Sequence, residues 1–331
     1  MLAYLRQLSL HDRLYIRALD ISAGREFFDC LSTNVSGVHY GDVADQACVE
    51  NVLLTQSLLG PRIQDLALTD MGWSPSGLRD ILDMALLTTR HLHHLQISLF
   101  KMESFLLTAL LDTLADLVRR DRRQLKTVIL DLAQPMSQIQ WESLGECTEM
   151  QRFHLGLHRT SQPVLTEILD LVLPKWTHLT ALYLCQPRSL TAETIRTLYR
   201  DLPRPDRLRE LHLIFEACQA SLYEHEFLEM IEAMPNLQRL EAQMDWTDRM
   251  MDRVATTLWD LRELVVTCSN IRFTCFGIRY VVWGAGMEKL NMRTSGKIWG
   301  GFLDAVRQRS KKVKVLVYGS MKWGGLVDEW E

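Results

Sequence analysis

The feature that most constrains this chain is a short apolar string, L-x-x-L-x-L with apolar variants, that recurs along its length. Copies begin at residues 16, 35, 63, 92, 125, 150, 179, 208, 237, 261, 287 and 313. The copies at Leu179, Leu208 and Leu237 each begin 29 residues after the preceding copy. A fixed interval of this size is typical of repeat architectures, in which each unit stacks on the next. The middle of the chain is therefore predicted to be a repeat array.

Segments with helical periodicity lie between the strings. They include residues 74–89, 102–120, 189–202 and 226–235. In residues 74–89 a serine precedes Pro75 at the first helical position, which is where proline suits a helix. Each unit is thus predicted to be one short strand followed by one helix. Such a unit cannot bury its own apolar side, so neighbouring units must stack and share a core.

On these strings and on this alternation, the chain resembles the leucine-rich repeat family over residues 14–318. It is most similar to the longer, 28–29-residue subtype of the ribonuclease-inhibitor-like and F-box-associated solenoids. The resemblance implies an α/β solenoid, with a curved parallel β-sheet on a concave face and helices on a convex face.

We expect residues 1–331 to form a single solenoid with about 12 repeats over residues 16–318. An open solenoid exposes an apolar end and a sheet edge at each terminus, and these need a cover. Residues 1–15 are predicted to be an amino-terminal helical cap. Residues 319–331 are predicted to be a cap over the last strand, with an uncapped tail as the alternative.

Composition limits the classes of partner. The 331 residues carry a net charge of -4, which gives no general attraction to polyanions, so nucleic acid is not the expected partner. No apolar run reaches the ~18 residues of a membrane span, and no membrane association is expected. Seven widely spaced cysteines, an odd number, favour reduced thiols in the cytoplasm or nucleus.

No signature of catalysis or of cofactor binding is present in the sequence. Glycine-rich phosphate loops, nucleophile elbows and paired metal-binding cysteines are all missing, so we expect no enzyme activity, no cofactor and no small-molecule substrate. The metal candidates are the HLHH segment at residues 91–94 and the set Cys147, His154 and His158. Neither has convincing ligand spacing, and no metal site is predicted. Cys185 is expected to be an inert small residue rather than a nucleophile.

Two basic runs, RRDRRQLK at residues 119–126 and RQRSKKVK at residues 307–314, lie between a predicted helix and the next strand. Such runs can act as nuclear-localisation or polyanion-binding patches. Cations at a helix C-terminus are also favoured by the helix dipole and by solvent, and that is the interpretation we adopt.

The strand strings predict which side chains line the inner wall of the sheet. Side chains alternate along a strand, so the residue between the second and third apolar positions of each string faces away from the helices. This row runs through Gln96, Ile129, His154, Tyr183, His212 and Glu241 and ends with Asn291 and Val317. With their neighbours, the predicted partner-binding residues are Gln96, Ile129, Arg152, His154, Tyr183, His212, Ile214, Arg239 and Glu241.

Aromatic and aliphatic side chains ringed by charges of both signs are typical of protein-binding patches. The sequence therefore predicts a non-enzymatic interaction module or adaptor that binds a polypeptide on its concave face. The family resemblance implies a further role as a substrate-recognition arm of a ubiquitin ligase. An F-box-like module would then come from elsewhere, because the strings start by residue 16. The alternatives are an RNA-binding arc and an enzyme-inhibitor arc, or an enzyme that uses the His154, Tyr183 and His212 stripe.

Overall fold

The computed structural model describes the strands, most of the helices and the turns between them. The described residues are 18–22, 59, 61–69, 75–99, 104–132, 135–157, 162–186, 191–215, 223–244, 246–268, 287–294 and 314–319. The expected cap at residues 1–15 lies outside them, and so does the expected cap at residues 319–331 except for Gly319, the last residue of a strand. The chain divides into two compact units, Met1–Leu157 and His158–Glu331, and each is described by itself.

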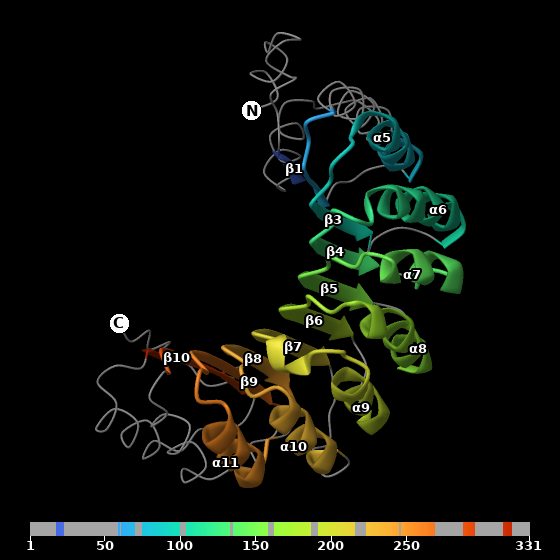
Figure 1. The fold of residues 1–331 in the computed structure, drawn as a ribbon. Helices are drawn as coiled ribbons and strands as arrows, with labels where there is room; N and C mark the ends of the chain where they lie inside the picture. Colours follow the sequence, from blue (N-terminus) through green and yellow to red (C-terminus); the bar gives the residue numbers. More distant parts are fainter. Residues whose placement is uncertain are drawn as a thin grey trace, which may run out of the picture. The chain divides into compact units, whose positions relative to one another are not determined.

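The first unit is a parallel sheet whose strands follow one another in chain order. The strands are β1 (Ala18–Ser22), β2 (Asp65–Thr69), β3 (His94–Leu99), β4 (Thr127–Leu132) and β5 (Arg152–Leu157). The helices are α5 (Pro75–Thr88), α6 (Ser104–Asp121) and α7 (Gln138–Gly145). In this unit the helices lie on one side of the strands (Figure 1).

The second unit repeats the same scheme. Its strands are β6 (Ala181–Gln186), β7 (Glu210–Phe215), β8 (Arg239–Gln243), β9 (Glu263–Cys268), β10 (Lys289–Thr294) and β11 (Lys314–Gly319). Its helices are α8 (Gln162–Val172), α9 (Ala192–Arg200), α10 (Glu224–Ala233) and α11 (Asp248–Thr257), with short 3-10 turns η1 (Leu173–Lys175) and η2 (Pro205–Arg207). The strand-and-helix alternation confirms the predicted fold class, an α/β solenoid of the leucine-rich-repeat type.

Alternating burial along the strands explains why the strings form this sheet. In β4 the apolar side chains of Val128, Leu130 and Leu132 are buried, while Ile129 and Asp131 between them are partly exposed. The buried set faces the helices and the other set faces the open side of the sheet. Where a strand has only one apolar phase, as β4 does, its register against the next strand is well determined.

The helices that cover the sheet have identifiable start signals. Thr191 caps α9 by accepting a hydrogen bond from the Thr194 backbone N–H at 3.1 Å, and Thr247 caps α11 in the same way through Met250 at 3.3 Å. The core beneath includes fully buried Trp141, Trp176 and Trp246 side chains.

The expected register of the last strand string is wrong by one residue. The last string was predicted to place Val317 in the row of Asn291, but the partner of Asn291 is Leu316, and Val317 pairs with Met292. The string VKVLVY is apolar in both phases, so its pattern could not choose between them. At the other end β1 pairs directly with β2, which leaves no place between them for a strand at residues 35–40. Those residues lie outside the described part of the chain.

Candidate interaction surface on the open face of the sheet

The open face of the second unit carries a central row formed by Tyr183, His212, Glu241 and Val265, one residue from each of four adjacent strands. The sequence predicted this row, and the register confirms it. Tyr183 is partly exposed, whereas His212 and Glu241 are only 4% and 6% exposed. The row therefore has an accessible aromatic end and an enclosed polar centre.

The enclosed centre is held by two contacts to His212. The Tyr183 ring stacks on the imidazole with centroids 4.0 Å apart and planes inclined by 25°. Nδ1 of His212 lies 2.8 Å from Glu241 Oε2, and because a carboxylate accepts, the Nδ1–H donates. The other ring nitrogen, Nε2, is buried and has no hydrogen-bond partner within the described residues. These contacts fix both the orientation and the tautomer of the ring.

A second row on the same face alternates in charge. Glu210, Arg239, Glu263 and Lys289 are cross-strand neighbours in register on β7 to β10. Arg239 Nε lies 3.4 Å from Glu263 Oε2, and Lys289 Nζ lies 2.8 Å from Glu263 Oε1. Opposite charges directly across neighbouring strands stabilise a sheet.

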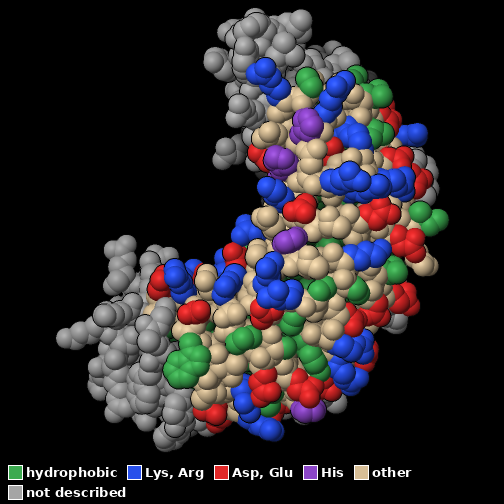
Figure 2. Space-filling view, viewed as in Figure 1, with side chains coloured by type: hydrophobic (Ala, Val, Ile, Leu, Met, Phe, Trp, Pro, Cys, Tyr) green, Lys and Arg blue, Asp and Glu red, His purple; other side chains and the backbone are tan. Residues whose placement is uncertain are grey.

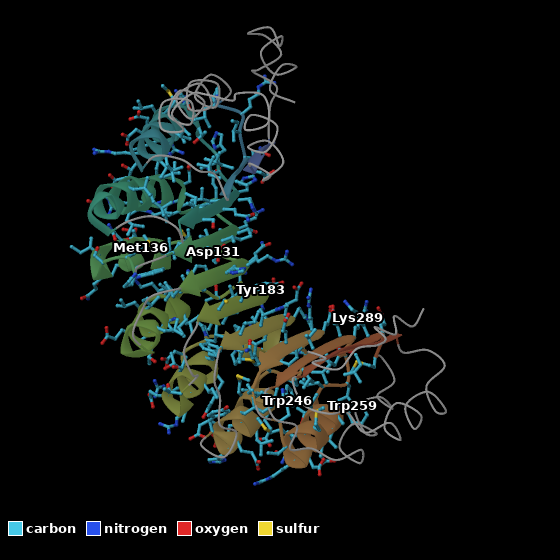
Figure 3. All side chains as sticks on the ribbon, turned by 180° about the vertical axis from the view of Figure 1, so that it is seen from behind. Asp131, Met136, Tyr183, Trp246, Trp259 and Lys289 are labelled. Carbon is cyan, nitrogen blue, oxygen red and sulfur yellow. The ribbon has the colours of Figure 1, made fainter. Side chains whose placement is uncertain are left out.

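The two rows are also linked to each other. The Tyr183 hydroxyl donates to the Glu210 carboxylate, and Arg239 Nη2 lies 3.9 Å from Glu241 Oε2. Tyr183 is thus held by a stacked ring at its face and a carboxylate at its hydroxyl. Figure 3 labels Tyr183 and Lys289 on the sheet.

The third row on this face adds the apolar side chain of Ile214, which is partly exposed and lies across from Cys185 on β6. Of the five residues predicted for this unit, Tyr183, Ile214 and Arg239 are therefore accessible to a partner. His212 and Glu241 instead support Tyr183 and Arg239. The sequence pattern placed these five side chains on the open face, as the register has them, but could not distinguish exposed side chains from buried ones.

The remaining predicted site residues lie in the first unit. Gln96, Ile129 and His154 are in register on β3, β4 and β5, and Arg152 is exposed at the start of β5. His154 Nε2 lies 3.4 Å from Asp131 Oδ1, with both side chains about a third exposed. The nine predicted partner-binding residues are thus divided between the two units, four on the first and five on the second.

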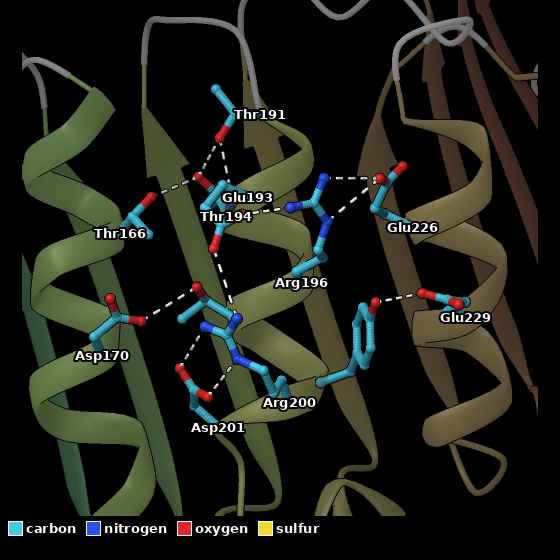
Figure 4. Close-up of polar contacts among 12 residues, drawn as sticks. Thr166, Asp170, Thr191, Glu193, Thr194, Arg196, Arg200, Asp201, Glu226 and Glu229 are labelled. Atoms are coloured by element: carbon cyan, nitrogen blue, oxygen red, sulfur yellow. Dashed lines mark hydrogen bonds and ion pairs between the residues drawn. The ribbon is translucent and has the colours of Figure 1, made fainter.

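The helix-covered side of the second unit is joined by its own polar network (Figure 4). Arg196 of α9 bridges Glu193 at 2.6 Å and Glu226 of α10 at 3.1 Å. The Tyr199 hydroxyl donates to Glu229 at 2.5 Å, and burial followed by this hydrogen bond raises the pKa of Tyr199 to about 12. These contacts tie neighbouring helices together and indicate a structural role for this side.

The residues considered above as metal ligands lie in different surroundings. His91 Nδ1 lies 2.9 Å from Gln124 Oε1, and His158 lies outside the described residues. Burial, then the charge of Glu146, raises the pKa of the Cys147 thiol to about 12, which keeps it protonated and unreactive. Over the described part of the chain, no three His, Cys, Asp or Glu side chains gather as metal ligands. No described helix is long and apolar enough to cross a membrane.

Three arginines of the first basic run, residues 119–126, form ion pairs with carboxylates. Arg119 pairs with Asp116 at 2.7 Å, and Arg122 pairs with Glu146 at 2.8 Å. Arg120 pairs with Asp121 and also donates to the backbone carbonyl of Ala85, at 3.0 Å, in the last turn of α5. Arg120 thus contacts the last turn of the preceding helix, whereas the expectation concerned the end of its own helix, α6. Of the second run, only Lys314 lies within the described residues.

The fold and its open face define a leucine-rich-repeat-like α/β solenoid. No protein-family model matches the sequence, and no curated protein matches it. Among solved structures, the chain is similar to a chain of the crystal structure of the Rad7 and Elc1 complex in yeast. The TM-score is 0.47 and the identity 13%, over 92% of this chain and 90% of that one.

Proposed function

We propose that this chain is a non-enzymatic protein-interaction module that binds a polypeptide partner on the open face of its second unit. The observation that carries the proposal is the arrangement of Tyr183, Ile214 and Arg239 on a sheet face that the helices leave uncovered. Aromatic and Arg side chains are the residues most enriched at the energetic centres of protein interfaces.

The surroundings of Tyr183 favour binding in a second way. Its ring and hydroxyl are already held by His212 and Glu210. A side chain that is ordered before binding loses little conformational entropy when a partner arrives. The buried His212–Glu241 pair thus serves the surface by fixing the residues that a partner would touch.

An enzymatic role for the same residues has less support. Nδ1 of His212 is bound to Glu241, and Nε2 is buried against the protein. A general base must lie within hydrogen-bond reach of the proton that it abstracts. His154, the other histidine of the predicted stripe, belongs to the first unit.

The proposal is tested by affinity purification from native extract with three forms of the chain. The wild type is compared with Ile214→Asp, which places a charge on the open face, and with Ile139→Asp, a matched change at an exposed position of α7. Circular dichroism first establishes that both variants are folded. A stoichiometric protein that is lost with Ile214→Asp and kept with Ile139→Asp is the expected result.

Retention of the partner by both variants would overturn the assignment of the face. Loss with Ile139→Asp alone would move the interaction to the helix-covered side. The finer expectation, that the chain is a substrate-recognition arm of a ubiquitin ligase, predicts ligase subunits among the co-purified proteins. The RNA-binding alternative predicts instead a recovered nucleic acid whose binding falls steeply with salt.

A further inference from the structure

The residues that lead into the strands of the first unit form a basic edge. The leading edge of a strand is taken as the four residues before it together with its first residue. Across β2, β3, β4 and β5 these twenty positions hold five cations and only two acids, Asp65 and Glu149. The five cations are all exposed: Arg62, Arg90, Arg123, Lys126 and Arg152.

Backbone hydrogen bonds show that these leading edges lie next to one another. The His93 N–H donates to the Gln64 carbonyl at 2.7 Å, and the Lys126 N–H donates to the His93 carbonyl at 2.9 Å. The Gln151 N–H in turn donates to the Lys126 carbonyl at 2.8 Å. Because adjacent strands are about 4.8 Å apart, the cations are within side-chain reach of a single extended ligand. Figure 2 shows Lys, Arg and His side chains on the surface of this unit.

The second unit provides an internal comparison. The same twenty positions before β6, β7, β8 and β9 hold four cations and four acids, so that edge has no net charge. The strands of both units are short and pair in parallel in chain order. The excess of three positive charges on the first unit therefore does not follow from the repeat architecture itself.

Helix dipoles account for only part of the excess, because Arg90 and Arg123 lie two residues beyond the ends of α5 and α6 whereas Lys126 and Arg152 lie farther out. The cations in the last turn of α6 are Arg119 and Arg120, and both are paired with carboxylates. Lys126 and Arg152 lie beyond the helix ends, where the dipole has little effect. No described carboxylate pairs with Arg90, Arg123 or Lys126. The field of these three cations is therefore not neutralised by a described neighbour.

We propose that the basic edge of the first unit binds an acidic polypeptide segment, one rich in Asp and Glu. Charge complementarity defines the partner as an anion. The twenty edge positions contain no Phe, Tyr or Trp on which nucleic-acid bases could stack. Carboxylates on a peptide match separate, exposed cations without stacking. This surface is distinct from Tyr183 and Ile214, so the two proposals are tested independently.

The experiment measures fluorescence anisotropy of a labelled peptide rich in Asp and Glu, with the isosteric Asn and Gln peptide as reference. The full chain is compared with an Arg123→Glu, Lys126→Glu double variant. The control is an Arg207→Glu, Arg262→Glu variant on the second unit, at exposed edge positions with the same change in net charge. We expect the first variant to weaken binding at least about tenfold and the control to change it less than about twofold. Binding should also weaken as salt is raised to about 0.15 M.

Three outcomes would overturn the proposal. The first is equal binding of the acidic and the amide peptides by the wild type. The second is equal weakening by both variants, which would make the effect one of overall charge. The third is tighter binding of a single-stranded oligonucleotide of the same charge with the same variant dependence, which would make the edge a nucleic-acid surface.

Discussion

At the scale of single residues, the environment of His212 shows how a polar group is kept on an open sheet face. Its ring is covered by Tyr183 and its Nδ1–H is bound by Glu241, yet Nε2 has no described hydrogen-bond partner. A buried polar atom without a partner destabilises the fold. The His212–Glu241 pair therefore depends on both members being present.

We predict that Glu241→Ala lowers the free energy of unfolding by about 1–3 kcal/mol, because it leaves the buried Nδ1–H of His212 without its acceptor. The matched control is Asp116→Ala, which breaks an exposed pair with Arg119 and is expected to change it by less than about 1 kcal/mol. Urea denaturation followed by circular dichroism measures both. Equal effects of the two substitutions would contradict a structural role for the buried pair.

At the scale of elements, α9 and α11 each begin where a threonine accepts a backbone hydrogen bond. Thr247 accepts from the Met250 N–H at 3.3 Å, and its hydroxyl donates to Glu224 of α10 at 2.8 Å. A single side chain thus ends the loop before α11 and links this helix to its neighbour.

Thr247→Ala is expected to lower the free energy of unfolding by about 1 kcal/mol through loss of the cap. Thr256→Ala, near the end of the same helix, removes a hydroxyl that donates to the Asp252 carbonyl at 2.9 Å on an exposed face. Because alanine is the better helix former, this control should be neutral or slightly stabilising. The two urea midpoints, measured side by side, distinguish the cap from a general loss of threonine. A Thr256→Ala midpoint as low as that of Thr247→Ala would contradict the capping role of Thr247.

A strand could be placed from its sequence when its apolar residues fell on only one of its two faces. β4, with Val128, Leu130 and Leu132 buried, has one apolar face and was placed correctly. β11 has apolar residues in both phases and was placed one residue out of register. The enclosure of His212 could not be predicted, because a string gives the direction of a side chain and not what covers it. The alternating charges of Glu210, Arg239, Glu263 and Lys289 at equivalent positions were the available signal for an internal ladder.

At the scale of the whole molecule, the described contacts join each repeat to its neighbours in the chain. Within each unit the strands pair in chain order, and the helices pack as α5 on α6, α6 on α7, α8 on α9, α9 on α10 and α10 on α11. In such an array, stability is approximately a sum of repeat terms and nearest-neighbour terms. A local defect should therefore weaken nearby repeats more than distant ones.

Leu211 of β7 is fully buried, and Leu211→Ala would leave a cavity that costs about 2–5 kcal/mol. Hydrogen exchange followed by mass spectrometry should then show the largest loss of protection in β7. The loss should be smaller in β6 and β8, which pair with β7, and smallest in β10. A uniform loss over β6 to β10 would mean that the second unit opens as one cooperative body. The graded result would instead mean that a substitution on the open face disturbs its own repeat and its neighbours, which is the condition for using point variants to locate a binding surface.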